Sequence, residues 1–430
     1  MIKRLFLLVI MVLVVVSFFL LQNKSLSGKS IILIVETRLA LSLKYYIERY
    51  KSDLEKEGYS VIIEQNISAS TSPLEIRKFL QEEYNEKGNL IGAVFVGNIP
   101  APLYNEKKHQ GDIYWHDYLS DLYYMDLNGI WKDNDNNGVY DQHSDTQFDF
   151  VNWILKKINL GNKRTPEIWI SRLRTDMLNS LGDEVSLLKK YFDKNHAYRT
   201  GKLEVPPKRA FVVSSDVDVL KSDWGARPFE VYSDVKVAQF HGNLTDTLRK
   251  FLSSDKGYEL GIISVFSGPR IHHFNFFKSG LDTIWQKTEE AKKLKVEYSD
   301  QDTGAGKFTW LDVKNIKPKV LFYHLLTSQV GRHNYPDYLA GTYIFTGLGL
   351  LAIAGTQHSG AVGTPILYED LKSGKSFGDA WKNALTWEME HSDIEIYWHN
   401  GDTLTWNIET LYKKAVLIGD GTLRLPVVIN

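Results

Sequence analysis

Short runs of apolar residues alternate with longer stretches of helical periodicity through most of the chain. The runs Ser30–Glu36, Tyr59–Glu64 and Leu90–Val96 have the length and composition of buried strands. Between the first two runs, apolar residues fall on one helical face, at Leu43, Tyr46, Ile47, Tyr50 and Leu54. Between the second and third, Ser72-Pro73-Leu74-Glu75 is a capping box that predicts the start of a helix closing near Gly88. This order predicts right-handed crossovers and a parallel sheet.

The same alternation resumes further along the chain. Thr165–Leu173 is typical of a strand, and a helix is expected from about Asp176 to Lys194. Pro206-Pro207 then marks the expected boundary between two lobes. Beyond it we expect the strands Arg209–Ser214, Gly261–Phe266, Val320–Leu326 and Leu350–Ala354, and helices at Leu244–Leu252, at Tyr338–Phe345 and after the capping residue Ser376. The pattern predicts an α/β protein with two Rossmann-like parallel-sheet lobes, 29–205 and 206–430, the first with an insertion at about 104–162.

The first 28 residues have a different character. Leu5 to Leu21 is apolar except for Ser17, and Lys3 and Arg4 precede it. This stretch is long enough to span a bilayer as a helix, and the basic residues before it favour a cytoplasmic amino terminus. We therefore expect a membrane anchor with an extracytoplasmic body. If the segment is instead a signal peptide cleaved near Ser25-Leu26-Ser27, the protein is secreted.

Composition narrows the function classes. The chain of 430 residues is 43% hydrophobic and 24% charged, which is ordinary for a globular protein. Lys plus Arg number 51 against 52 Asp plus Glu, so the charge gives no reason to expect a nucleic-acid partner. The count of cysteines is zero, which excludes disulfides, thiolate metal sites and a cysteine nucleophile.

An Asp/Asn-rich stretch inside the insertion resembles part of a calcium loop. Oxygen side chains alternate at Asp133, Asp135 and Asn137, Gly138 stands at the sixth position, and Asp141 at the ninth. The twelfth position is Ser144 rather than a bidentate Glu. We expect either a structural Ca²⁺ site formed by Asp133, Asp135, Asn137 and Asp141, or a solvated turn.

The candidate chemistry lies just past two apolar runs. Val320–Leu326 is followed by Thr327-Ser328, and Gly261–Phe266 is followed by Ser267-Gly268-Pro269 and then by His272 and His273. Parallel strands in α/β sheets present their functional groups past their carboxyl ends. If the two strands are neighbours, both ends open onto one crevice, where Ser328 is the candidate reactive group.

Several segments carry a resemblance to a known family. In chain order they are PEIWISRL, SVFSGPRIHHF, VLFYHLLTSQVG, YLAGTYIFTGLGLLAIAGT and GDGTLRL. Their order and approximate spacing resemble those of the gingipain-type cysteine peptidases, whose catalytic lobe is caspase-like. The resemblance implies that the second lobe is caspase-like. It also implies that the family's catalytic histidine and cysteine positions fall on Phe266 and Ser328.

These replacements leave two hypotheses open. A phenyl ring cannot accept a proton, and a serine without a base is a weak nucleophile, so we expect an inactive peptidase homologue. It would act as a surface scaffold or bind a peptide or protein in the crevice. The alternative is an active serine-type hydrolase that uses Ser328 with His272 or His273. His324 is excluded as the base because four strand residues place it roughly 13 Å from Ser328.

Overall fold

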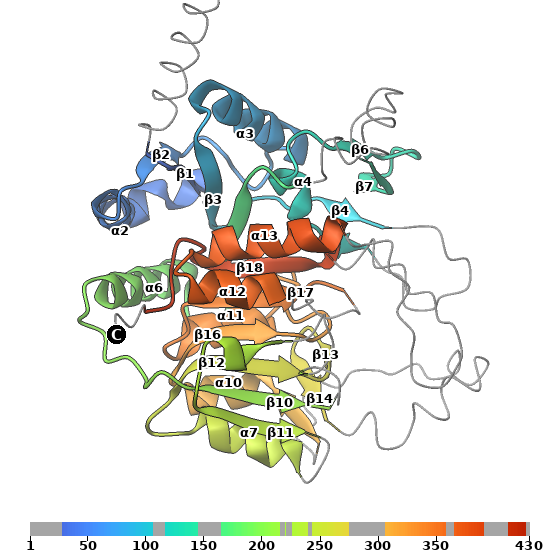
Figure 1. Cartoon of the computed structure of the whole chain (residues 1–430). Coiled ribbons are helices and arrows are strands. Elements are labelled where there is room, and N and C mark those ends of the chain that lie inside the picture. Colours follow the sequence, from blue (N-terminus) through green and yellow to red (C-terminus); the bar gives the residue numbers. More distant parts are fainter. Residues whose placement is uncertain are drawn as a thin grey trace, which may run out of the picture.

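A computed structural model describes most of the chain (Figure 1). The described residues are 28–105, 117–144, 165–215, 220, 226–239, 243–274, 306–357, 365–390 and 412–426. The predicted anchor, Leu5 to Leu21, lies outside them. Within these ranges no helix is both long and apolar enough to cross a membrane.

A ten-stranded sheet forms the centre of the molecule. From edge to edge its order is β11-β10-β12-β16-β17-β18-β9-β3-β1-β2. In chain order its strands are β1 (Ser30–Val35), β2 (Ser60–Glu64), β3 (Leu90–Val96), β9 (Trp169–Leu173), β10 (Ala210–Ser214), β11 (Val235–Gln239), β12 (Tyr258–Ser264), β16 (Val320–Leu325), β17 (Leu351–Gly355) and β18 (Ala415–Gly419).

The sheet consists of two parallel blocks. The first block, β2-β1-β3-β9-β18, is parallel throughout, and so is the second block, β11-β10-β12-β16-β17. They meet at the antiparallel pair β17–β18. The predicted α/β class with parallel sheets is confirmed, and the two sets of strands share one sheet. The segments that follow β9 and β16 lie together, because Arg174 contacts His333 at 3.3 Å and the Tyr338 hydroxyl donates to the Arg174 carbonyl.

Helices cover both faces of the sheet. On β16, Tyr323 stacks on Tyr343 while the next residue, His324, hydrogen-bonds Tyr368. Successive strand residues point to opposite faces, so the helices that carry Tyr343 and Tyr368 lie on opposite sides. α11 packs on α6, which packs on α2, and α12 packs on α13. The helices are α2 (Thr37–Lys56), α3 (Pro73–Lys87), α4 (Leu122–Met125), α6 (Glu184–Arg199), α7 (Leu244–Leu252), α10 (Trp310–Ile316), α11 (Leu339–Thr346), α12 (Pro365–Lys372) and α13 (Phe377–Glu390).

Some predicted boundaries are confirmed and others are wrong, among them the strand expected from Thr165, which begins at Trp169. The capping box of Ser72 with Glu75 starts α3, and Gly88 ends it in the left-handed conformation, as predicted. The helix expected from Asp176 begins only at Glu184, because the preceding residues turn and Asp183 caps the helix by accepting a hydrogen bond from the Ser186 amide.

Another wrong boundary is the carboxyl end of the strand that was predicted to run to Phe266. It ends at Ser264, and Phe266–Gly268 forms a separate short strand, β13. β13 pairs with β14 (Ile271–His273), which pairs with β15 (Lys307–Thr309). The turn at Pro269 folds the chain back on itself, so these backbone groups bond within a small antiparallel sheet.

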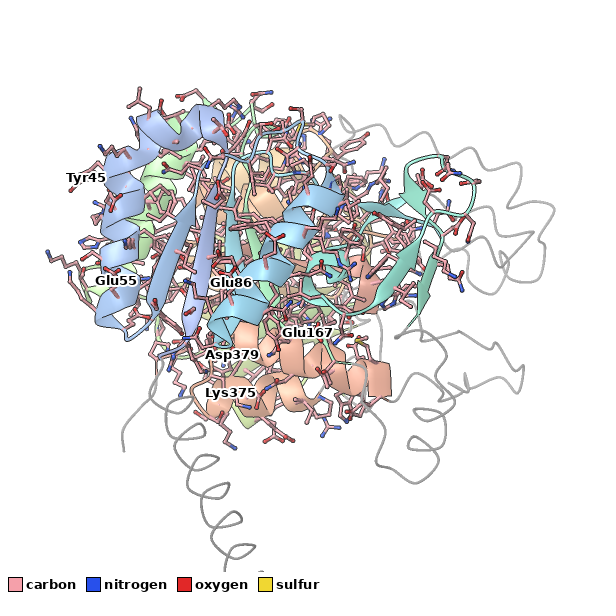
Figure 2. All side chains as sticks on the ribbon, turned by 90° about the horizontal axis from the view of Figure 1, so that it is seen from above. Tyr45, Glu55, Glu86, Glu167, Lys375 and Asp379 are labelled. Atoms are coloured by element: carbon pink, nitrogen blue, oxygen red, sulfur yellow. The ribbon has the colours of Figure 1, made fainter. Side chains whose placement is uncertain are left out.

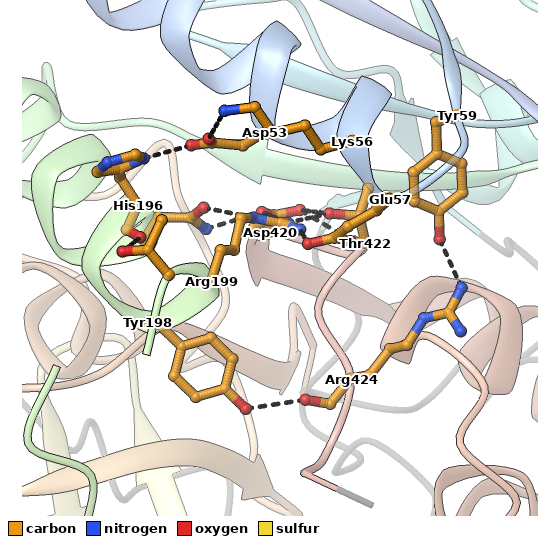
Figure 3. A network of polar contacts seen from close by, with 12 residues as sticks. Asp53, Lys56, Glu57, Tyr59, His196, Tyr198, Arg199, Asp420, Thr422 and Arg424 are labelled. Atoms are coloured by element: carbon orange, nitrogen blue, oxygen red, sulfur yellow. Dashed lines mark hydrogen bonds and ion pairs between the residues drawn. The ribbon is translucent and has the colours of Figure 1, made fainter. Parts of the chain in front are cut away.

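Buried charges hold the C-terminal segment that brings β18 into the middle of the sheet (Figure 3). Arg199 of α6 contacts Asp420 at 2.6 Å, and both side chains are almost fully buried. Arg199 also pairs with Glu57 at the end of α2, and Asn195 donates a hydrogen bond to Asp420. Burial alone would raise the pKa of the Asp420 carboxyl, but Arg199 and the Thr422 hydroxyl hold that pKa below its usual value.

Candidate functional site

The two apolar runs that precede the candidate chemistry are neighbouring strands. β12 pairs with β16 in parallel register, and Ile263 lies opposite Leu325. The carboxyl ends of β12 and β16 therefore lie side by side, at one end of the strands of the second block. We call residues 264–273 and 326–331 the strand-end site.

Ser328 lies in a tight turn after β16. The backbone amide of Gln329 donates to the Gln357 carbonyl at 3.0 Å, and that of Gly331 donates to the Gly355 carbonyl at 2.7 Å. Gln329 has a left-handed backbone, with φ of 58°. A Cβ atom at Gly331 would lie 2.9 Å from the Ala354 carbonyl oxygen, so glycine permits this approach. The turn is thus pinned to the end of β17, and Ser328 is only 5% exposed.

Thr327, beside Ser328, is a hydroxyl that the sequence analysis did not single out. It is 1% exposed, and its Oγ1 atom has no hydrogen-bond partner within the described ranges. A buried hydroxyl without a partner costs free energy, so such a group is typical of a position that a ligand or water satisfies.

Phe266, the position matched to the family's histidine, lies half-buried on β13. It is paired across the hairpin with His273, and the two ring centroids are 5.9 Å apart. The phenyl ring packs beside this imidazole and offers no group that could take a proton.

His272 is fully buried and both of its ring nitrogens are occupied. Nδ1 lies 2.7 Å from the Ser267 hydroxyl, and Nε2 lies 3.2 Å from the Tyr343 hydroxyl of α11. Burial, and then the neighbouring His273, lower the pKa of His272 to about 3. The structure therefore joins His272 to Ser267 and Tyr343.

The contact with Ser267 was missed in the sequence, although a signal existed. A two-residue turn at Pro269-Arg270 makes Ser267 and His272 directly opposed partners in a hairpin. Tyr343 could not be foreseen in the same way, because its approach depends on how α11 packs on the sheet.

The other histidines of this block are also held neutral. Burial, and then Lys307, lower the pKa of His273 to about 4. Burial lowers the pKa of His324 to about 3, and its Nδ1 lies 2.8 Å from the Tyr368 hydroxyl on the opposite face from α11. His333 is buried against Arg174, and burial with the charges of Arg172 and Arg174 lowers its pKa well below the usual value. An imidazole with so low a pKa is a poor general base near neutral pH.

The Asp/Asn-rich loop joins β6 (Ile130–Lys132) to β7 (Val139–Tyr140). Carboxylate oxygens of Asp133, Asp135 and Asp141 lie within 4.8 Å of one another. The backbone amides of Asn137 and Gly138 donate to Asp133, and Gly138 has φ of 84°. The Asn137 side-chain oxygen accepts from the Val139 amide at 2.8 Å. Three of the four predicted ligands therefore converge, and their hard oxygen atoms fit a calcium ion.

Comparisons with known proteins agree with the architecture. No protein-family model matches the chain, and no curated protein matches its sequence. Among solved structures, the chain is similar to the Arg-specific cysteine proteinase gingipain R, with a TM-score of 0.56 and 13% sequence identity. The similarity covers 93% of this chain and 79% of that one. The fold is therefore gingipain-like and caspase-like, as the sequence motifs predicted.

Proposed function

We propose that the protein is a catalytically inactive peptidase homologue that displays a peptide-binding strand-end site outside the cytoplasm. The observation that carries this proposal is the state of His272. Its two ring nitrogens engage Ser267 and Tyr343, so His272 has no nitrogen left for Ser328. With Phe266 at the matched histidine position, this arrangement favours loss of the proton transfer that hydrolysis requires.

The buried hydroxyls favour binding. Thr327 is buried without a partner within the described ranges, and Ser328 lies next to it at the carboxyl end of β16. Ligands of open α/β sheets bind outside these strand ends. A peptide backbone offers both donors and acceptors, which matches a hydroxyl because a hydroxyl can donate and accept.

A peptide array tests the binding proposal. Full-length protein should retain a subset of peptides uncleaved, and Thr327→Val should weaken the best of them by about 3- to 10-fold, the effect of one hydrogen bond. Thr200→Val is the matched control, because Thr200 is exposed at the end of α6. The proposal fails if no peptide binds, or if both variants bind as wild type does.

The anchor is part of the proposal and rests on the sequence. A retained helix from Leu5 to Leu21 should keep the protein in the membrane fraction through high-salt and carbonate washes, since ionic conditions do not extract a spanning apolar helix. A mature amino terminus near Ser27 or Gly28 would show instead that the protein is secreted.

We also propose that Asp133, Asp135 and Asp141, with Asn137, bind a structural calcium ion. The convergence of the three carboxylates supports this. The ion would offset their mutual repulsion and tie β6 to β7 within the insertion.

A further inference from the structure

A groove beside α3 carries a second, independent inference. It has a volume of about 660 Å³ and is bounded on one side by Lys78, Glu82 and Asn85 of α3. Leu127 and Glu167 form its other side. In Figure 2, Glu167 lies between α3 and α13, near the α3 residue Glu86. The volume falls within the usual range for sites that hold small molecules.

The groove's walls are fixed by hydrogen bonds. The Glu167 carboxylate accepts from the Leu127 amide at 2.7 Å and from the Asn128 side chain. Gln81 of α3 donates to the Leu127 carbonyl at 2.6 Å. Arg77 donates to the carbonyls of Asp126 and Gly129, which holds the loop between them against α3. The shape of the groove is therefore set before any ligand arrives.

The lining mixes charged and neutral polar groups, with one cation, Lys78, and two carboxylates, Glu82 and Glu167. Lys78 and Glu82 stand one helical turn apart on α3, both exposed to water, and their charges compensate one another. Asn85 and Asn128 add side-chain amides, each with a donor and an acceptor in one plane. There is no cluster of cations in this lining that would select a phosphate or carboxylate.

Tyr84 supplies the remaining feature. It lines the groove half-buried together with Glu167, and burial, followed by the charge of Glu167, raises the pKa of its phenol. An aromatic ring offers a flat apolar surface with a polar tip. A ligand that fits this lining needs an apolar face to stack on the ring. It also needs several hydroxyls that exchange hydrogen bonds with the amides and carboxylates.

We propose that this groove binds a neutral oligosaccharide, with its ring face on Tyr84 and its hydroxyls on Asn85 and Asn128. Sugars present alternating donors and acceptors along a ring whose C–H face is apolar, which matches the lining. A charged ligand is disfavoured, because the exposed Lys78 and Glu82 are screened by water and the Glu167 carboxylate already accepts from the Leu127 amide and the Asn128 side chain.

The test is calorimetric titration of the full chain with maltotriose, cellotriose and triacetylchitotriose. At least one should bind saturably, and Tyr84→Ala should weaken it by about 10-fold through loss of the stacked ring. Asn85→Ala should weaken it less. Tyr45→Ala is the matched control, because Tyr45 is 67% exposed on α2, away from Glu167 in Figure 2.

Unchanged melting temperatures would show that each variant is folded. The inference is overturned if none of the trisaccharides binds at concentrations up to about 10 mM. It is also overturned if Tyr84→Ala and Tyr45→Ala change the affinity for the trisaccharide equally. Binding of free amino acids instead of the trisaccharides would overturn it as well.

Discussion

The ion pairs of the first block and the strand-end site of the second block differ in the kind of polar group that they bury. At the first block, Arg172 pairs with Asp121 at 2.6 Å and Arg199 pairs with Asp420, all nearly inaccessible to water. At the strand-end site, the buried groups include hydroxyls and the neutral imidazole of His272, and Thr327 has no partner within the described ranges. The first region is closed by charge pairs, which suits a structural joint. The other keeps neutral hydrogen-bonding groups, which suits a ligand.

Breaking a charge pair of the first block should have the largest effect. Arg199→Met leaves the Asp420 carboxylate buried without its cation, and we expect a loss of about 3–5 kcal/mol in the free energy of unfolding. Urea denaturation at pH 7 measures this loss. Since Asp420 has a lowered pKa in the native state, the pair stabilises above the unfolded pKa, and this contribution disappears as the pH falls through the native value.

Arg49→Met provides the matched comparison. Arg49 also joins two helices through an aspartate, Asp193, at 2.7 Å, but that carboxylate is mostly exposed. The expected loss is at most about 1 kcal/mol. Equal losses in the two variants would contradict a structural role for the buried pair.

Mild acid should lower the free energy of unfolding through the buried histidines of the second block. His324 titrates near 6.5 in the unfolded chain and at about 3 in the native state, so the unfolded state binds the proton more readily. Stability is full above pH 6.5 and falls by about 1.4 kcal/mol per pH unit as the pH drops toward 4.5. His324→Gln should flatten this slope by that amount while its amide oxygen still accepts from Tyr368.

Denaturation curves at pH 7, 6 and 5 give the slope of the unfolding free energy against pH. Asp420 stays ionised in this window in the wild-type protein, because its pKa is lowered. Arg49→Met removes only a pair with an exposed carboxylate, so it should leave the slope unchanged. The other buried histidines keep part of the slope in each single variant. A slope as steep in His324→Gln and in His272→Gln as in the wild type would show that these two imidazoles are not held neutral.

The smallest expected effect concerns the calcium loop, which lies outside both regions compared above. A chelator should lower the melting temperature by about 1–3 °C, and calcium at about tenfold over its dissociation constant should restore it by mass action. Asp135→Asn, which removes one converging carboxylate, should abolish the response. The absence of any shift at millimolar calcium would leave a solvated turn.

Local patterns in the sequence predicted local structure well. Ser72 and Glu75 lie three residues apart, and their reciprocal bonds start α3 where expected. The adjacency of β12 and β16 was also within reach, because neighbouring α/β units usually place their strands side by side. The start of α6 at Glu184 was missed because Leu178 to Gly182 looks helical but turns.

What the sequence could not predict depends on distant contacts. β18 comes from the end of the chain and lies between β17 and β9, and no local pattern encodes that order. The pairing of Arg199 with Asp420 likewise joins positions 221 residues apart. At the strand-end site, the engagement of His272 by Tyr343 needed the packing of α11, so the sequence left His272 open as a base for Ser328.

The central claim is that neither Phe266 nor His272 can act as a base for Ser328. Its most direct test is to treat full-length wild-type protein with a fluorophosphonate and search for the adduct on Ser328 by mass spectrometry. We predict that Ser328 stays unmodified, because Phe266 cannot accept its proton and His272 is bound to Ser267 and Tyr343. Labelling of Ser328 that disappears in Ser328→Ala and in His272→Ala or His273→Ala would contradict the claim and establish a serine hydrolase.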